Sequence, residues 1–227
     1  MKNWTKILLL TVLPLFALTS CNDDDDELQP GANVMVVHAS PDAPSVDLLI
    51  DDKKVNTSAL SYPNNTGYLS VSSGTRNVKV NAAGTSTTVI NGNLDLESGR
   101  SYSVFAINTL SNIEPLILED DLASPANGRA HVRFLHLSPD APAVDIAVQN
   151  GPTLFSNRAF KSATAFTPVD AGTYTLEVRL AGTNTTVLTV PNVMLENGAI
   201  YTVFAQGFAN PASGNTNTLG AGAIRNN

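Results

Sequence analysis

The chain has 227 residues, of which 43% are hydrophobic and 15% are charged, and its formal net charge is −7 at pH 7. The hydrophobic fraction suffices for packed cores, while the lack of any cluster of basic residues argues against binding to nucleic acid or to anionic membrane surfaces. The single cysteine excludes a disulfide within the chain, and the abundance of Gly, Ser, Thr and Asn favours a β-rich extracellular protein.

The first twenty residues have the pattern of a secretory signal peptide. Lys2 and Lys6 precede an apolar stretch, Ile7–Leu18, that is too short to cross a hydrocarbon core of ~30 Å. The next residues, Leu-Thr-Ser-Cys, resemble the lipobox of bacterial lipoproteins, in which the cysteine is acylated. We therefore expect residues 1–20 to be removed and Cys21 to carry the lipid that anchors the chain to a membrane. The alternative, a free or disulfide-bonded cysteine, has no partner cysteine to support it.

Residues 21–30 connect this cysteine to the first expected strand. Asp23–Glu27 repel one another and cannot pack, so we expect a solvated acidic tether. Acidic residues at this position also resemble the export signal that directs some lipoproteins to the outer face of the outer membrane, and both interpretations stay open. Consecutive Asp residues lack the alternating ligand spacing of a calcium loop. The expected location is the outer membrane, through a lipid anchor, with exposure at the cell surface as the open question.

A ten-residue motif that occurs twice sets the organisation of the remaining chain. His38–Asp47 returns 98 residues later as His136–Asp145, and eight of the ten positions are identical. Such identity marks an internal repeat. It predicts two tandem domains, residues 31–122 and 129–227, joined by a linker at residues 123–128.

Each copy has the pattern of a series of short strands. The two prolines of Ser-Pro-Asp-Ala-Pro interrupt the ladder after the first strand, and no segment keeps a 3.6-residue period over three turns. The strands expected in the first copy are 34–37, 46–51, 68–71, 77–80, 87–90, 101–107 and 115–118. The second copy repeats this order, and its tail adds one strand near 219–224. We predict an all-β chain of two immunoglobulin-like antiparallel β-sandwiches, each long enough to fold alone.

A Leu-Glu-x-Gly-x-x-Tyr pattern precedes a strand in both copies and ends at Tyr102 and Tyr201. It is similar to the tyrosine corner of immunoglobulin-type sandwiches, in which the hydroxyl bonds to nearby backbone. The Gly-to-Tyr spacing is one residue longer than in that corner, so we favour core packing as the role of both side chains.

The repeated motif supplies the candidate site residues. They are His38, Ser40, Asp42 and Asp47 in the first copy and His136, Ser138, Asp140 and Asp145 in the second. Imidazole and carboxylate groups can bind metal or act as acid and base, but each copy has one motif histidine and no HExxH, GxSxG or phosphate-loop motif. The alternative is structural: an Asp after proline stabilises a turn, and the His locks the bend. We favour this alternative and predict no catalytic residue, metal or cofactor.

The motif also carries a resemblance to a known family. His-x-Ser-Pro-Asp-Ala-Pro-x-Val-Asp after an apolar strand resembles the signature of the bacterial domain-of-unknown-function family 4397, as do the Gly-Thr-x-x-x-x-Val and Tyr-x-Val-Phe-Ala strands. The resemblance extends from Asn33 to about Gly207. It implies extracytoplasmic β-sandwich modules, often in tandem on secreted or surface-anchored proteins, and it carries no established catalytic residue.

We expect a monomeric, non-enzymatic lipoprotein of the cell envelope that acts as a surface scaffold or binding module. Its partners would be the membrane, through the lipid on Cys21, and a glycan or another surface protein. The first alternative is a glycan-binding accessory lipoprotein of a polysaccharide-uptake system, and the less favoured one is a metal-dependent hydrolase. Glycan sites use flat aromatic faces, and the only tryptophan lies in the signal peptide. The aromatic candidates, for which burial is the alternative, are Tyr62, Tyr68, Phe155, Phe160 and Phe166.

Overall fold

The computed structural model describes residues 31–227, so the signal peptide, Cys21 and the acidic tether lie outside the described residues. The first copy contains β1 (Gly31–His38), β2 (Val46–Ile50), β3 (Lys53–Lys54), β4 (Asn65–Ser72), β5 (Gly74–Ala82), β6 (Thr88–Leu96), β7 (Ser101–Ile107), the 3-10 turn η1 (Leu110–Asn112) and β8 (Glu114–Glu119). The second copy contains β9 (Arg129–His136), β10 (Val144–Val148), β11 (Thr153–Arg158), β12 (Thr167–Asp170), β13 (Gly172–Leu180), β14 (Thr186–Leu195), β15 (Ile200–Gln206) and β16 (Gly220–Arg225). No helix between residues 31 and 227 has the length and apolar character needed to span a membrane.

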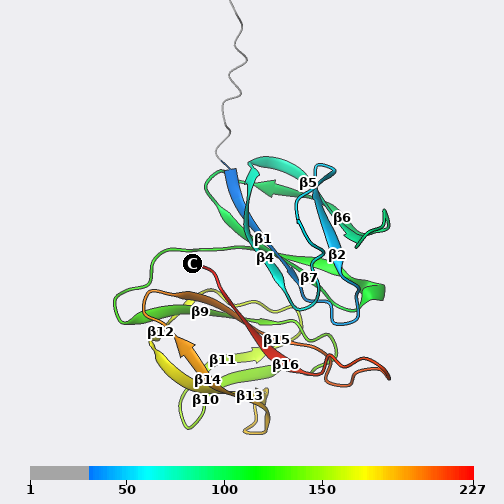
Figure 1. Ribbon diagram of the computed structural model, residues 1–227. Coiled ribbons are helices and arrows are strands. Elements are labelled where there is room, and N and C mark those ends of the chain that lie inside the picture. Colours follow the sequence, from blue (N-terminus) through cyan, green and yellow to red (C-terminus); the bar gives the residue numbers. More distant parts are fainter. Residues whose placement is uncertain (1–30) are drawn as a thin grey trace, which may run out of the picture.

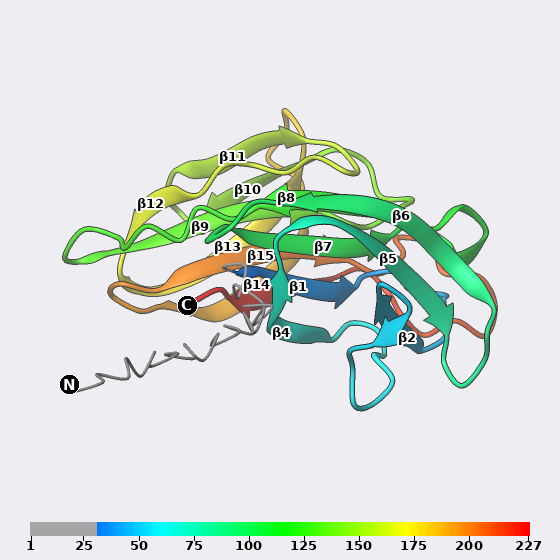
Figure 2. The same ribbon diagram turned by 90° about the horizontal axis from the view of Figure 1, so that it is seen from above.

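The chain is all-β and forms two tandem domains, each built from two four-stranded sheets in a sandwich-like arrangement. In the first copy the sheets have the orders β3-β2-β5-β6 and β4-β1-β7-β8, and in the second β11-β10-β13-β14 and β12-β9-β15-β16. The strand expected near the C-terminus is confirmed as β16. Figure 1 shows the first copy above the second, and the view from above shows the first copy overlying it (Figure 2).

Two strand pairs depart from the expected antiparallel arrangement. β1 pairs with β7, and β9 with β15, in parallel. The expectation of wholly antiparallel sandwiches is therefore wrong for the central pair of each of these sheets. Parallel neighbours need a long crossover, and the five strands between β1 and β7 provide it.

Each copy has a hydrophobic core between its two sheets. Val34 and Val36 of β1 face this core in the first copy, and Val132 and Phe134 of β9 face it in the second. Successive residues of a strand point to opposite faces, so the neighbours of these side chains must face away from it. In the sheets β3-β2-β5-β6 and β11-β10-β13-β14, which we call the outer sheets, that second face meets solvent, and β5 and β13 accordingly alternate apolar with polar residues.

The inner sheets are β4-β1-β7-β8 and β12-β9-β15-β16, and the faces that they turn away from their own cores pack against each other. The nine buried residues of this third cluster are Met35, Val37, Ala39, Phe105, Ile107, Leu135, Leu137, Phe204 and Ile224. Phe105 and Phe204 occupy equivalent positions in the two copies, and their rings meet edge to face with centroids 6.4 Å apart. This contact between equivalent residues gives the interface the self-complementary character of a two-fold dimer. Each copy on its own would therefore expose an apolar face, and the expectation that each copy folds alone stays a prediction.

A buried ion pair joins the two copies beside this cluster. Arg133 of β9 binds Asp120, which follows β8, at 2.7 Å, and both side chains are almost fully buried. The same Asp120 accepts hydrogen bonds from Ser103 at 2.6 Å and from the Tyr68 hydroxyl. Arg133 also donates to Ser103 at 3.1 Å and to Thr202 at 2.8 Å. Burial together with Asp120 raises the pKa of Tyr68 to about 12. The expected linker at 123–128 therefore follows a residue that is anchored inside the interface.

Candidate functional site

The motif histidines are buried and bound to backbone. His38 Nε2 lies 2.9 Å from the carbonyl oxygen of Pro44, and His136 Nε2 lies 3.0 Å from that of Pro142. A carbonyl oxygen only accepts, so the Nε2 atoms carry the hydrogen. The pKa of both imidazoles is lowered, because the effect of burial is larger than the opposing effect of these hydrogen bonds. Both rings are therefore neutral near pH 7, and each ties the end of the Ser-Pro-Asp-Ala-Pro loop to the strand before it.

The first motif aspartates hold a neighbouring loop. Asp42 Oδ1 accepts the backbone N–H of Leu110 at 2.8 Å, where η1 begins. Asp140 accepts the N–H groups of Ala209 and Asn210 at 2.7 and 2.8 Å. These aspartates thus join the motif loop to the chain that follows β7 or β15.

The motif serines are buried beside these loops. Ser40 donates weakly to Asp42, at 3.4 Å. The hydroxyl of Ser138 has no hydrogen-bond partner within residues 31–227. Neither serine makes a hydrogen bond to a motif imidazole, as an activated nucleophile would.

The second motif aspartates hold the turn between the last two strands of the outer sheet. Asp47 Oδ2 accepts the N–H of Gly84 at 3.0 Å, and Asp145 Oδ2 accepts that of Gly182 at 2.9 Å. Both glycines have a positive φ, +71° and +72°, which glycine adopts without strain. Lys54 and then Gly84 lower the pKa of Asp47, while the backbone N–H groups of Asn157 and Gly182 lower that of Asp145.

The polar atoms of the motif therefore contact backbone in most cases, and His and Asp are directed to different loops. Nowhere in residues 31–227 do three His, Cys, Asp or Glu side chains gather closely enough to hold a metal ion. The arrangement can hold loops in place, but it presents no paired acid and base.

Tyr102 and Tyr201 combine the two roles considered for them. Tyr102 is buried, and its hydroxyl accepts the N–H of Glu97, five residues upstream, at 3.1 Å. The hydroxyl of Tyr201 accepts the N–H of Glu196 at 3.3 Å in the same way. Core packing and a corner-like hydrogen bond thus belong to the same side chain.

The candidate aromatic platforms are dispersed over both copies. Phe155 is buried and stacks on Phe134 inside the second core, with centroids 6.2 Å apart. The Cζ atom of Arg133 lies 4.5 Å from the centroid of the Phe166 ring, and Phe160 packs against the interface cluster. Tyr62 lies edge-on to His38. These side chains do not form one flat exposed face.

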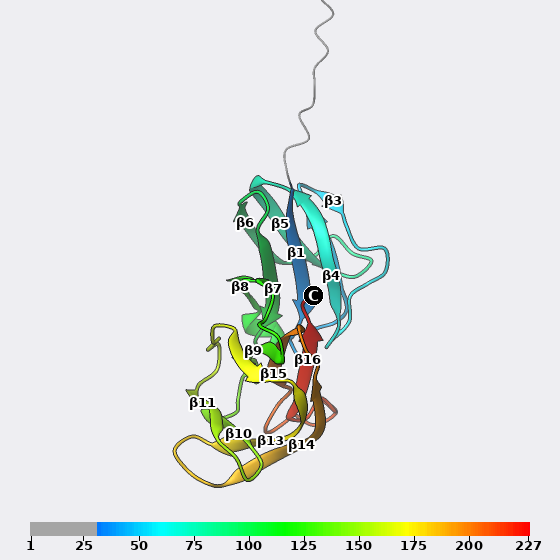
Figure 3. The ribbon, with the colours of Figure 1, turned by 90° about the vertical axis from the view of Figure 1, so that its left-hand side faces the viewer.

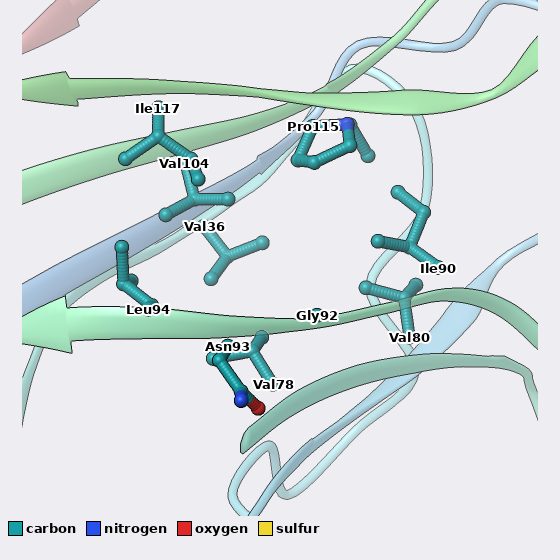
Figure 4. Close-up of a pocket in the computed structure, with 11 residues that line it drawn as sticks. Val36, Val78, Val80, Ile90, Gly92, Asn93, Leu94, Val104, Pro115 and Ile117 are labelled. Atoms are coloured by element: carbon teal, nitrogen blue, oxygen red, sulfur yellow. The ribbon is translucent and has the colours of Figure 1, made fainter. Parts of the chain in front are cut away.

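Both sandwiches have a narrow apolar cleft at the same open edge. In the first copy it lies between β6 and β8, where Pro115 and Ile117 face Ile90 and Leu94 (Figure 4). Its volume is about 70 Å³, and the equivalent cleft between β14 and β16 has about 120 Å³. Ligand sites usually have volumes of roughly 300–1,000 Å³. Both clefts are therefore too small for an ordinary ligand.

A larger hollow is present in the first copy. It has a volume of about 570 Å³ and lies between the chain that follows β3 and the start of β4. Its walls consist mainly of neutral polar side chains from the Asn56–Ser61 and Asn64–Thr66 segments. The motif residues are not part of it.

Sequence reasoning missed both this hollow and the buried ion pair. Their residues lie where the two copies differ, because Arg133 replaces Met35 and Asn56 replaces Leu154 at the 98-residue offset. These differences between equivalent positions are visible when the two copies are aligned residue by residue. Motif identity instead indicates the residues that the copies share.

A family model described as a domain of unknown function, DUF4397, matches residues 32–147 and again 147–222. The boundary between the two matches falls within β10, whereas the sheets of the second copy begin at β9. No curated protein matches the chain.

Proposed function

The chain belongs to the DUF4397 family, and on that premise we propose that it is a non-enzymatic lipoprotein of the cell envelope that acts as a binding module or surface scaffold. The observation that supports this role is the use of the motif side chains. The two histidines and four aspartates of the motif hydrogen-bond to backbone groups of three separate loops per copy. Because these side chains are occupied in holding loops, they serve the framework, and binding would fall to other surfaces of the protein.

The proposal includes an anchor at Cys21, which rests on the lipobox-like sequence before it. Replacing Cys21 with Ser removes the acylated thiol and should release the protein into the periplasm as a soluble monomer. Membrane fractionation with an alkaline wash checks the release, and size-exclusion chromatography checks the monomer. A variant that stays with the membranes after the wash would show that the lipid assignment is wrong.

Exposure at the cell surface is a separate part of the proposal and rests on Asp23–Glu27. Protease added to whole cells should degrade the wild-type protein. Replacing these five residues with Ser and Gly should protect it, because the altered lipoprotein then stays inside the outer membrane. Equal cleavage of both forms would limit the acidic segment to the role of a solvated tether.

We also propose that each sandwich is immunoglobulin-like. The hydrogen bonds from the backbone of Glu97 to Tyr102 and from that of Glu196 to Tyr201 support this topology, because the tyrosine corner of that class also bonds its hydroxyl to backbone a few residues upstream. Superposing an experimental structure on immunoglobulin-type sandwiches is the test, and a different strand order would contradict the proposal.

The second candidate function is glycan binding in support of polysaccharide uptake. The observation that favours it is the neutral polar hollow of the first copy, whose volume suits a small saccharide. Binding of neutral oligosaccharides to the purified protein tests this candidate.

A further inference from the structure

The hollow of the first copy exists because one side chain takes the place of a strand. Asn56 Oδ1 accepts the N–H of Leu48 at 2.8 Å, and Asn56 Nδ2 donates to the Val46 carbonyl at 3.2 Å. The Leu48 N–H is a group of β2 that a neighbouring backbone would otherwise pair, whereas the Val46 carbonyl also accepts the backbone N–H of Leu60. In the second copy β11 provides that backbone and pairs with β10. The first copy therefore has only a two-residue β3 at this edge, and the chain after it arches away (Figure 3).

The arching segment, residues 56–60, is held at both ends. Asn56 fixes its start, and Leu60 pairs with Val46 through two backbone hydrogen bonds of 2.8 Å. Thr57, Ser58 and Ala59 lie between these points and are exposed. A loop fixed in this way loses little conformational entropy when a ligand binds to it.

Three residues that line the hollow are polar where the second copy has an apolar residue at the 98-residue offset. Leu154 corresponds to Asn56, Phe155 to Thr57 and Ala163 to Asn65. Phe155 is buried and packs against Phe134, whereas Thr57 is exposed and borders the hollow. The second copy thus buries an aromatic ring at the position where the first copy exposes the Thr57 hydroxyl.

The chemistry of the walls selects a class of ligand. The polar lining residues are Asn56, Thr57, Ser58, Ser61, Asn64, Asn65 and Thr66, and no residue that lines the hollow is charged. An anionic ligand would need Lys or Arg, and a metal ion would need carboxylates or imidazoles. Hydroxyl and amide groups both donate and accept, as do the hydroxyls of a sugar. Leu69, which is partly exposed, adds apolar surface for the C–H face of a pyranose ring.

We propose that this hollow of the first copy is a binding site for a neutral saccharide. The inference rests on the glycan-binding candidate function and locates its site. Within residues 31–227 the hydroxyls of Thr57 and Ser58 make no other hydrogen bond, and Asn65 uses only Oδ1, toward Gly67. These three side chains therefore have donors and acceptors free for sugar hydroxyls.

The test is an NMR titration of the two-copy protein, prepared as the Cys21→Ser variant so that no lipid enters the assay. The probes are neutral oligosaccharides of glucose, galactose, mannose and xylose, with oligogalacturonate and an Asn/Ser-rich peptide as comparison ligands. We expect backbone amide shifts confined to residues 55–69 with a neutral oligosaccharide. Binding by oligogalacturonate or the peptide at the hollow, without binding of any neutral sugar, would overturn the assignment.

Matched variants separate a specific site from a general effect. Ser58→Phe places an aromatic ring in the hollow, and Ser156→Phe makes the same change at the equivalent exposed position of the second copy. Asn65→Ala introduces the residue that the second copy already has, Ala163. Each change in the hollow should weaken binding by about ten-fold or more, as expected for the loss of a hydrogen bond to ligand. Ser156→Phe should leave binding unchanged.

The outcomes also separate this inference from the proposed function. Saccharide binding with shifts elsewhere, or binding that Ser58→Phe leaves intact, would overturn the hollow and preserve glycan binding. Failure of every saccharide in the panel would overturn both the hollow and the glycan candidate. The anchored scaffold is tested independently by fractionation of the Cys21→Ser variant.

Discussion

The two copies have the same strands and the same loop locks, yet they differ at the edge of the outer sheet and at their common interface. The first copy has the Asn56 side chain and a polar hollow where the second has β11 and Phe155. At the interface the first copy has Met35 where the second has Arg133. The shared residues thus hold the framework, and the residues that differ determine where the copies join and where one of them is open.

Separating the copies should have the largest effect on stability. Residues 31–122 alone would expose the buried side chains of Met35, Val37 and Phe105. Each such side chain contributes roughly 1.5–3 kcal/mol when buried. We expect each half to melt well below the intact chain, or to self-associate through the exposed face, which calorimetry with analytical ultracentrifugation will detect. Halves that stay monomeric and match the intact chain in melting temperature would show that the interface adds nothing.

Removing one partner of the buried ion pair should have the next largest effect. Arg133→Ala leaves the Asp120 carboxylate buried and unpaired, which typically costs about 3–5 kcal/mol. The double variant Arg133→Met with Asp120→Asn uses the residues found at the equivalent positions, Met35 and Asn226, and should recover most of this loss. Chemical denaturation measures both, and a double variant as unstable as Arg133→Ala would contradict the pairing account.

Mutation of the motif histidines should give a smaller and equal effect in the two copies. His38→Ala and His136→Ala each remove one buried hydrogen bond to a proline carbonyl, worth about 1–3 kcal/mol. Thermal melts with and without a chelator provide the measurement. A metal site would instead give a chelator-sensitive melt in the wild-type protein, because a ligand of the native state raises its melting temperature.

The same histidines should make stability depend on pH. Burial lowers their folded-state pKa, so the unfolded chain binds more protons below about pH 6.5 and the free energy of unfolding falls as pH drops through that range. Replacing both with Gln keeps a neutral donor and should remove this decline. The matched control is His131→Gln, outside the motif, which should leave the decline unchanged.

A second loss of stability should appear at lower pH. The pKa values of Asp47 and Asp145 are lowered in the folded state, so their contribution is complete above about pH 4 and is lost as pH falls further. Asn at either position should reduce this second loss and leave the first one. A stability curve with only one loss, unchanged by Asn at Asp47 or Asp145, would contradict the assignment of the second loss to these two carboxylates.

The all-β class, the two copies and most strands could be predicted from the sequence, because apolar alternation and turn residues are local signals. The apolar run Val34–Val37 also indicated a strand, but it did not reveal what covers its second face. That depends on contact with the other copy, as for Met35 and Leu135. The parallel pairing of β1 with β7 depends in the same way on contacts between distant segments.

The hollow was not predictable from motif identity, since Asn56 and Thr57 have unremarkable polar identities on their own. They stand out only when they are compared with Leu154 and Phe155, the apolar residues at the equivalent positions of the second copy. The roles of the motif residues were easier to anticipate, because a His and an Asp around two prolines suit a locked loop. Which backbone group each one binds required the fold, as shown by Asp145 and Gly182.

Native-state hydrogen exchange of the intact chain tests most directly whether the two copies form one unit around a shared third core. The amides of β1 and β7 and those of β9 and β15 should exchange through a single opening, with one common free energy, because each inner sheet loses its cover when the other unfolds. Two distinct free energies, with one copy exchanging while the other stays protected, would show that the copies are independent domains.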